Sequence, residues 1–263
     1  MPKWGHEIAA AVLGVLIGAG FFFGVGWTFK ALKPKTGATI ETPVQSEPTR
    51  QLLIEASEGD LVYRASSINL QDGSELQKAI MAEQPANMAR ALETAGRGRN
   101  PATKIHVTYT RTATAGPLTS LLKSQETTRA DGETDIRFAA GLFNALEGAD
   151  GTLSDIFHSN PETVRALDTL LCGAVRQAKE MRSDSGDLPA CETSQEFSFL
   201  NGAPAVFLQS DRPNTISGIR FYFEAGRIGR KKEGLYVITL RQSDFIAHVR
   251  PEYKGLFSGA PAR

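Results

Sequence analysis

The chain has 263 residues with 29 basic and 29 acidic side chains, and beyond Lys35 the acidic ones slightly outnumber the basic ones. Domains that bind nucleic acid through bulk electrostatics are usually strongly basic, so this composition argues against nucleic acid as a partner. After the N-terminal segments, enough chain remains for one domain with a sizeable core.

Residues 8–29, preceded by a short tail of residues 1–7, form an uncharged apolar run of 22 residues. At about 1.5 Å per residue this run covers the roughly 30 Å hydrocarbon core of a bilayer. A secretory signal peptide has a shorter apolar region and ends in small residues at its cleavage site. This run ends instead at the bulky residues Trp27 and Phe29. We therefore expect an uncleaved, single-pass transmembrane helix over residues 8–29.

The predicted transmembrane helix contains two pairs of glycines four residues apart, Gly14 with Gly18 and Gly20 with Gly24. Glycine lets a second helix approach closely, which favours helix association in lipid. The pattern therefore favours self-association or a membrane protein partner. Glycine is also generally commoner in membrane helices, so general enrichment is the alternative explanation.

Residues 30–50 are rich in Pro and Thr, which predicts an extended stalk between the membrane and the domain. Lys30, Lys33 and Lys35 follow the apolar run directly, and this charge bias favours a cytoplasmic domain. The stalk composition and the even number of cysteines favour an exported domain, and long domains cross membranes largely regardless of charge. We expect an inner-membrane protein with a periplasmic domain, and a cytoplasmic domain is the alternative.

The remaining sequence predicts a single α+β domain over residues 51–257, with an antiparallel sheet and several helices, followed by a flexible tail over residues 258–263. Two short strands come first. A capping box at Ser74 then begins a helix that we expect to stop near Pro85, with a second helix over 86–95. Alternation predicts a strand over Lys104–Thr112.

The second half of the domain begins with a weakly patterned region, in which we expect a helix around Phe138–Leu146. The clearest helix has Asn160 as its N-cap and Pro161 at its first position, followed by an apolar stripe at helical spacing. Four strands are expected after it, at residues 196–200, 205–209, 218–225 and 234–242.

His106 and Thr108 lie two residues apart on a predicted strand, so both side chains lie on one face. This spacing resembles one H-x-T motif of the 2H phosphoesterases, in which two such pairs face each other. The resemblance implies a phosphodiester hydrolase in which His106 and Thr108 belong to the site. It also requires a second pair, and neither His158 nor His248 has a hydroxyl two residues later. The alternative is a surface strand that happens to carry a histidine.

No spacing typical of a metal site occurs among the histidines and cysteines, and no cofactor motif is present, so we expect neither a metal nor a cofactor. The two cysteines, Cys172 and Cys191, form a disulfide if the domain is exported and remain thiols if it is cytoplasmic.

A basic loop is expected between the last two strands, and it is a candidate binding surface for an anionic lipid, polymer or protein. Solvation of an ordinary turn is the alternative reading. The basic residues of this loop are Arg227, Arg230, Lys231 and Lys232.

Taken together, the anchor, the stalk and the lack of a catalytic motif predict a non-enzymatic interaction or assembly subunit of a cell-envelope complex. The partner is expected to be a membrane protein or a second copy of the chain. A membrane-bound hydrolase that uses His106, and a ligand-sensing domain, are the alternatives.

Overall fold

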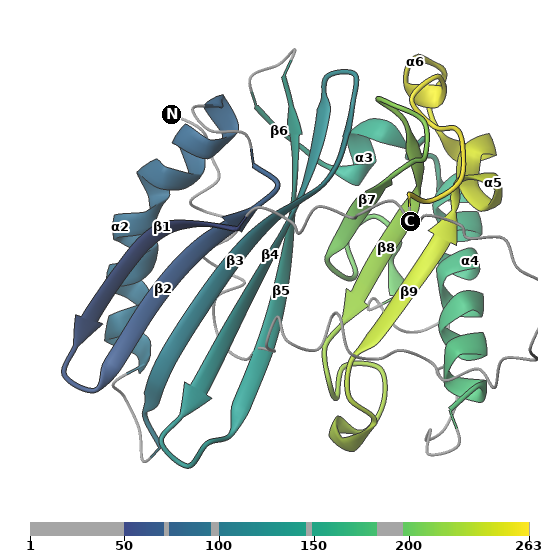
Figure 1. The fold of residues 1–263 in the computed structure, drawn as a ribbon. Helices are drawn as coiled ribbons and strands as arrows, with labels where there is room; N and C mark the ends of the chain where they lie inside the picture. The colour runs from purple at the N-terminus through teal and green to yellow at the C-terminus, as the bar shows by residue number, and fades with distance from the viewer. Residues whose placement is uncertain (1–49, 71–73, 96–99, 146–148, 183–196, 263) are drawn as a thin grey trace, which may run out of the picture.

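The computed structural model describes residues 50–70, 74–95, 100–145, 149–182 and 197–262. The predicted transmembrane helix with its four glycines, and the stalk up to residue 49, lie outside these residues. Among the helices that the structure describes, none is both long and apolar enough to span a membrane. The described part is an α+β domain with two mostly antiparallel sheets and a few helices (Figure 1).

The larger sheet contains six strands that lie side by side in sequence order. Adjacent strands are antiparallel, except that the second and third strands run parallel because the chain returns through a helix between them. The elements are β1 (Arg50–Glu58), β2 (Leu61–Ile68), α2 (Glu75–Ala95), β3 (Ala102–Ala115), β4 (Leu118–Arg129), β5 (Thr134–Asn144) and β6 (Ala149–Gly151).

α2 is one continuous helix, so the expectation of two helices separated near Pro85 is wrong. Proline removes one helical hydrogen bond, which frees the carbonyl of Met81, four residues earlier. Both residues lie on the exposed side of the helix, where water can hydrate that carbonyl. One half of the predicted capping box is present, because the Gln77 backbone amide donates a hydrogen bond of 3.1 Å to the Ser74 hydroxyl. The Gln77 side chain donates to Gln51 of β1 at 2.7 Å.

The inner side of α2 packs across β1, β2 and β3 around its own hydrophobic core. Within that core, Gln84 of α2 is 1% exposed, and its side chain is hydrogen-bonded to tyrosines of β2 and β3. Its amide nitrogen donates to the Tyr109 hydroxyl at 3.1 Å, and its oxygen accepts from the Tyr63 hydroxyl at 3.4 Å. These bonds fix the helix over the sheet.

The expected helix around Phe138–Leu146 is wrong, because residues up to Asn144 belong to β5. The whole strand pairs antiparallel with β4, from Thr134 opposite Thr128 to Asn144 opposite Leu118. Alanine and leucine in this run favour a helix locally. Pairing with β4 nevertheless provides hydrogen bonds for the backbone amides and carbonyls of β5 in the extended conformation.

The smaller sheet has three antiparallel strands, β7 (Ala205–Gln209), β8 (Ile216–Phe223) and β9 (Tyr236–Arg241). α4 (Pro161–Glu180) packs on it and begins as predicted, with the Asn160 side chain accepting a hydrogen bond of 2.9 Å from the Thr163 amide. The remaining short elements are α3 (Leu153–Ile156), η3 (Lys231–Glu233), α5 (Gln242–Phe245), η4 (Ile246–His248) and α6 (Pro251–Lys254).

The main core lies between α4 and the smaller sheet, and it is rich in phenylalanine. Phe199 is fully buried there, in edge contacts with Phe157 and Phe221. Its amide donates to the Asp168 carboxylate of α4 at 2.7 Å, so residues 197–200 form a turn and not the expected strand.

The two sheets meet where β3, β4 and β5 contact β7 and β8. α2 and α4 lie on opposite sides of the molecule (Figure 1). Phe138 stacks on Tyr222 at 4.8 Å between ring centroids, and the Phe207 amide donates to the Ser120 hydroxyl at 2.9 Å. Residues 258–262, expected to be a flexible tail, lie against the end of β7, where the Ala262 amide donates to the Gln209 carbonyl at 3.0 Å.

Candidate functional site

His106 lies on β3, on the face of the larger sheet opposite α2, because its neighbours Ile105 and Val107 belong to the core beneath that helix. Its Nε2 atom lies 3.1 Å from the Ser66 hydroxyl, which in turn lies 3.5 Å from the Thr108 hydroxyl. Burial first, and then the nearby arginines of β1 and β2, lower the pKa of His106. The imidazole is therefore neutral at neutral pH.

A serine hydroxyl beside a neutral histidine is the pairing that activates a nucleophile. In this case Ser66 is only 2% exposed and Thr108 only 4% exposed, so both hydroxyls are covered. A nucleophile must contact its substrate, so this arrangement favours a structural role for Ser66. The sequence did not single out Ser66, because only the parallel pairing of β2 with β3 brings it opposite Thr108.

The other two described histidines lie together elsewhere in the fold. The His158 amide donates to the His248 carbonyl at 3.0 Å, beside the bridge between Phe157 and Val249 in the main core. The structure thus brings these histidines to each other, and His106 has its contacts with β2 instead. Within the described residues, no three His, Cys, Asp or Glu side chains gather in a way that would hold a metal ion.

The basic loop between β8 and β9 is anchored by a buried ion pair. Lys179 of α4 is 1% exposed, and its ammonium lies 3.1 Å from the Glu233 carboxylate and 2.9 Å from the Ile228 carbonyl. Glu233 also accepts from the Tyr236 hydroxyl at 2.7 Å and from the Arg230 amide at 2.8 Å. Burial, and then the hydrogen bond to Glu233, raise the pKa of Tyr236 to about 12.

Two of the four basic side chains of this loop bind acceptors of the domain itself. The Arg227 guanidinium donates to the Gly202 carbonyl, and the Lys231 ammonium donates to the Glu133 carboxylate at 3.3 Å. Arg230 and Lys232 are exposed, and neither side chain has a described hydrogen bond or ion pair. The loop therefore presents two cations on a rigid support, fewer than the sequence alone predicts.

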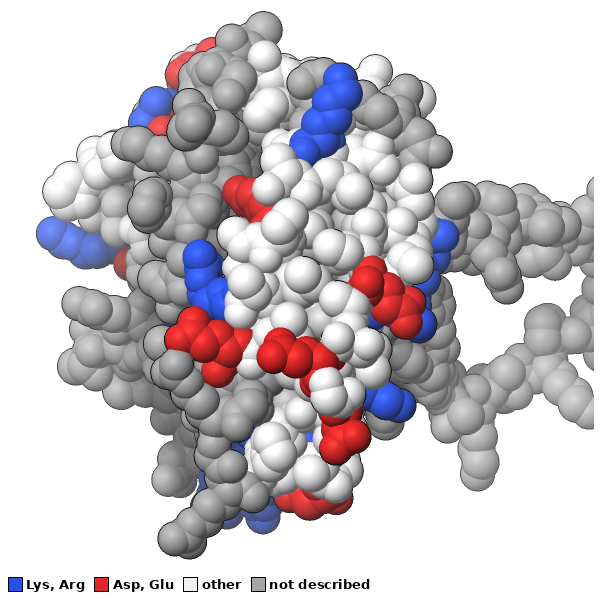
Figure 2. All heavy atoms as spheres, turned by 90° about the vertical axis from the view of Figure 1, so that its left-hand side faces the viewer, with Lys and Arg blue, Asp and Glu red and all other residues white. Residues whose placement is uncertain are grey.

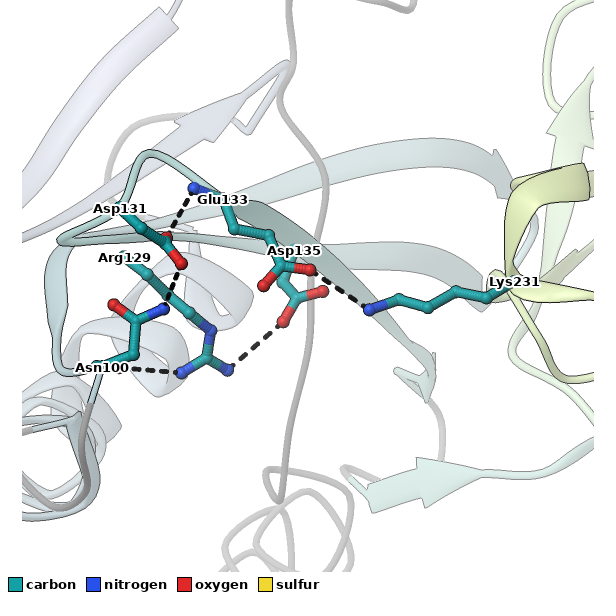
Figure 3. A network of polar contacts seen from close by, with 6 residues as sticks. All are labelled: Asn100, Arg129, Asp131, Glu133, Asp135 and Lys231. Atoms are coloured by element: carbon teal, nitrogen blue, oxygen red, sulfur yellow. Dashed lines mark hydrogen bonds and ion pairs between the residues drawn. The ribbon is translucent and has the colours of Figure 1, made fainter.

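Lys231 also joins the loop to the hairpin between β4 and β5 (Figure 3). In that hairpin, the Arg129 guanidinium contacts the Asp135 carboxylate at 3.3 Å. Asp131 accepts a hydrogen bond of 2.6 Å from the side-chain amide of Asn100, which precedes β3. The Lys231–Glu133 pair is highly exposed, so it adds little stability. Its geometry nevertheless connects the ends of the two sheets.

The outer face of α2 differs from that of an ordinary surface helix. Such helices usually carry charged side chains on the face away from the core. Among the exposed side chains of α2 that the structure describes, only Lys78 and Glu93 are charged, and Glu83 and Arg90 are partly buried. The exposed residues between them are uncharged, and they are Met81, Ala82, Pro85, Ala86 and Ala89.

Figure 2 views the side of the molecule on which α2 lies, and it shows a broad area with few charged side chains above a group of acidic ones. Among the five uncharged residues, Met81 has the largest apolar side chain, and it is 42% exposed. We call the five uncharged residues from Met81 to Ala89 the α2 face.

Cys172 is fully buried on α4, and Cys191 lies outside the described residues, so their disulfide stays a prediction.

Comparisons with known proteins identify structures but no sequence family. No known family matches the sequence, and no curated protein matches it. A crystal structure of a DUF3298 family protein from Pseudomonas aeruginosa PAO1 is similar, with 11% identity over 82% of this chain and 95% of the other, at a TM-score of 0.46. A member of the same family from Bacteroides fragilis NCTC 9343 has 11% identity over 80% of this chain and 97% of the other, at a TM-score of 0.44.

Proposed function

We propose that the chain is a membrane-anchored, non-enzymatic interaction subunit of a cell-envelope complex. The observation that carries this proposal is the α2 face. It is an exposed, uncharged surface on a helix that is fixed to the sheet, which is the kind of surface that partners bury. Its partner is a protein whose own contact surface lacks charge.

The support beneath α2 favours recognition over catalysis. The helix is held by the buried Gln84 and its two tyrosine partners, so the α2 face is ordered before a partner arrives. Preorganisation of this kind lowers the entropic cost of binding. By contrast, His106 is paired with a covered serine, and the geometry supplies no open nucleophile there.

A single charged residue in the α2 face tests the proposal. Ala86→Glu places a carboxylate in the centre of the face and keeps a residue type that is compatible with a helix. Desolvating that carboxylate in an interface is costly, so the variant is expected to lose its partner or its self-association. The matched control is Gln177→Glu, which adds a similar charge to the exposed side of α4.

The measurement is made on the full chain, purified in mild detergent, by light scattering after size exclusion and by identification of co-purified proteins. Wild type and Gln177→Glu are expected to show the same complex, and Ala86→Glu is expected to run without it. If Ala86→Glu retains the complex fully, or if the wild type is a monomer without partners, the proposal is wrong.

A further inference from the structure

A surface pocket of about 490 Å³ lies where β3 meets the turn between β7 and β8. The pairing of β2 with β3 ends at Thr110, so β2 does not cover the last residues of β3. Beyond this point, the Gln209 side chain accepts a hydrogen bond of 2.9 Å from the Thr114 backbone amide. The pocket is lined by Arg111, Thr114 and residues 209–214.

A bulge in β3 between Arg111 and Ala113 shifts the strand register at this point. Bulges of this type redirect side chains and occur often beside functional sites. Here the shift allows both Arg111 and Thr114 to line the pocket. Arg111 is thus presented to the pocket from a strand, which is a rigid support.

The turn that forms the opposite wall is built by an extensive set of hydrogen bonds. The Asp211 carboxylate accepts from the Ala260 amide at 2.9 Å and from the Ser210 hydroxyl at 3.0 Å. Gly259, at a φ of +78°, crosses so closely that a Cβ there would overlap Ser210 and Asp211. The wall is therefore fixed, and the negative charge of Asp211 is engaged within the turn.

Two arginine side chains line the pocket. Within the described residues, neither the Arg111 nor the Arg212 guanidinium has a hydrogen bond or an ion pair, although the charge of Arg212 contributes to lowering the pKa of Asp211, after the hydrogen bonds from Ala260 and Ser210. The two guanidiniums therefore line one pocket without a described acceptor, and an anionic ligand would supply that acceptor.

We propose that this pocket binds a small ligand through a carboxylate or phosphate group. The two guanidiniums supply charge-assisted donors whose fork geometry matches either oxyanion. The volume suits a small molecule. This proposal does not depend on the function assigned to the α2 face, which lies on another element.

The test measures the binding of inorganic phosphate and of citrate to the full chain in detergent, by calorimetry and by thermal shift at constant ionic strength. Saturable binding of phosphate, of citrate or of both is expected, and the preferred anion identifies the ligand class. Arg111→Gln should weaken that binding about tenfold or more, whereas Arg165→Gln, on the exposed side of α4, should leave it unchanged.

Arg212→Gln, in the opposite wall of the pocket, should also weaken anion binding, because it removes the second guanidinium. The proposal is overturned if neither anion binds beyond a sodium chloride control, or if Arg111→Gln and Arg165→Gln affect binding equally.

Discussion

Replacing Lys179 with methionine should destabilise the domain strongly, because the side chain is similar in size but its charge is lost. The Glu233 carboxylate, whose side chain is fully buried, would lose the ammonium that lies 3.1 Å from it. Breaking a buried pair by removing one partner costs roughly 3–5 kcal/mol. Glu233 keeps the hydrogen bonds from Tyr236 and Arg230, which places the expected loss near the lower end, at about 3 kcal/mol.

For a domain of this size, about 3 kcal/mol corresponds to a fall in Tm of roughly 6–12 °C. The assay is thermal denaturation of the full chain in detergent, followed by circular dichroism. The control is the neutral pair Lys179→Met with Glu233→Gln, in which no charge is left buried. We expect the pair to recover most of the loss. A single variant as stable as the wild type, or a double variant as unstable as the single one, would refute this reasoning.

Three further predictions concern a buried lysine, two glycines and the arginine beside His106. Burial lowers the pKa of Lys123 from its ordinary 10.5 to about 8, so the folded state binds fewer protons than the unfolded state between those values and stability rises with pH there. Lys123→Met should abolish that rise in denaturant titrations over the same pH range. At pH 7 the variant should be more stable than the wild type by up to about 3 kcal/mol, because the cost of burying the charge is removed. Gly173→Ala should stabilise the domain by about 0.5–1 kcal/mol, because the position lies on the open side of α4. Gly218→Ala should destabilise the domain by about 1–3 kcal/mol, because the added Cβ would overlap the β9 backbone. Both changes are measured as shifts in Tm. Arg64→Gln should raise the pKa of His106 in an NMR titration, and an unchanged value would show that this arginine does not act on it.

The sequence predicted correctly those elements whose ends are determined by residues close to them in the chain. The Asn160 cap with Pro161 at the first position located α4, and the strand at Ala205–Gln209 was predicted with its observed bounds. The capping hydroxyl of Ser74 was also identified correctly. In each case the physical cause lies within a few residues of the feature.

The errors occurred where distant partners decide the structure. Pro85 was expected to end a helix, but its place on the exposed side makes the lost hydrogen bond tolerable. Phe138 was expected in a helix, but pairing with β4 holds it in a strand. Residues 197–200 were expected to form a strand, but the Asp168 carboxylate of α4 holds them in a turn.

The candidate sites depend on such distant contacts even more strongly. The sequence selected His106 and the basic loop because their residues are adjacent or follow a short pattern. It missed Ser66, the α2 face and the pair Arg111 and Arg212, because these require the register of β2, the orientation of α2 and the contact of β3 with a turn about 100 residues later. An uncharged exposed face at helical spacing was readable in principle, but only after α2 was known to be continuous.

The single parallel pair in the larger sheet has a consequence for the order of folding. β3, β4 and β5 follow one another through short turns, so each can pair with its neighbour as a hairpin. β2 can reach β3 only after the intervening helix has formed and closed a much longer loop, which is entropically costly. We therefore expect the β1–β2 hairpin and α2 to join the sheet late and to separate from it first. In hydrogen exchange, this unit would open at a lower free energy than β3, β4 and β5.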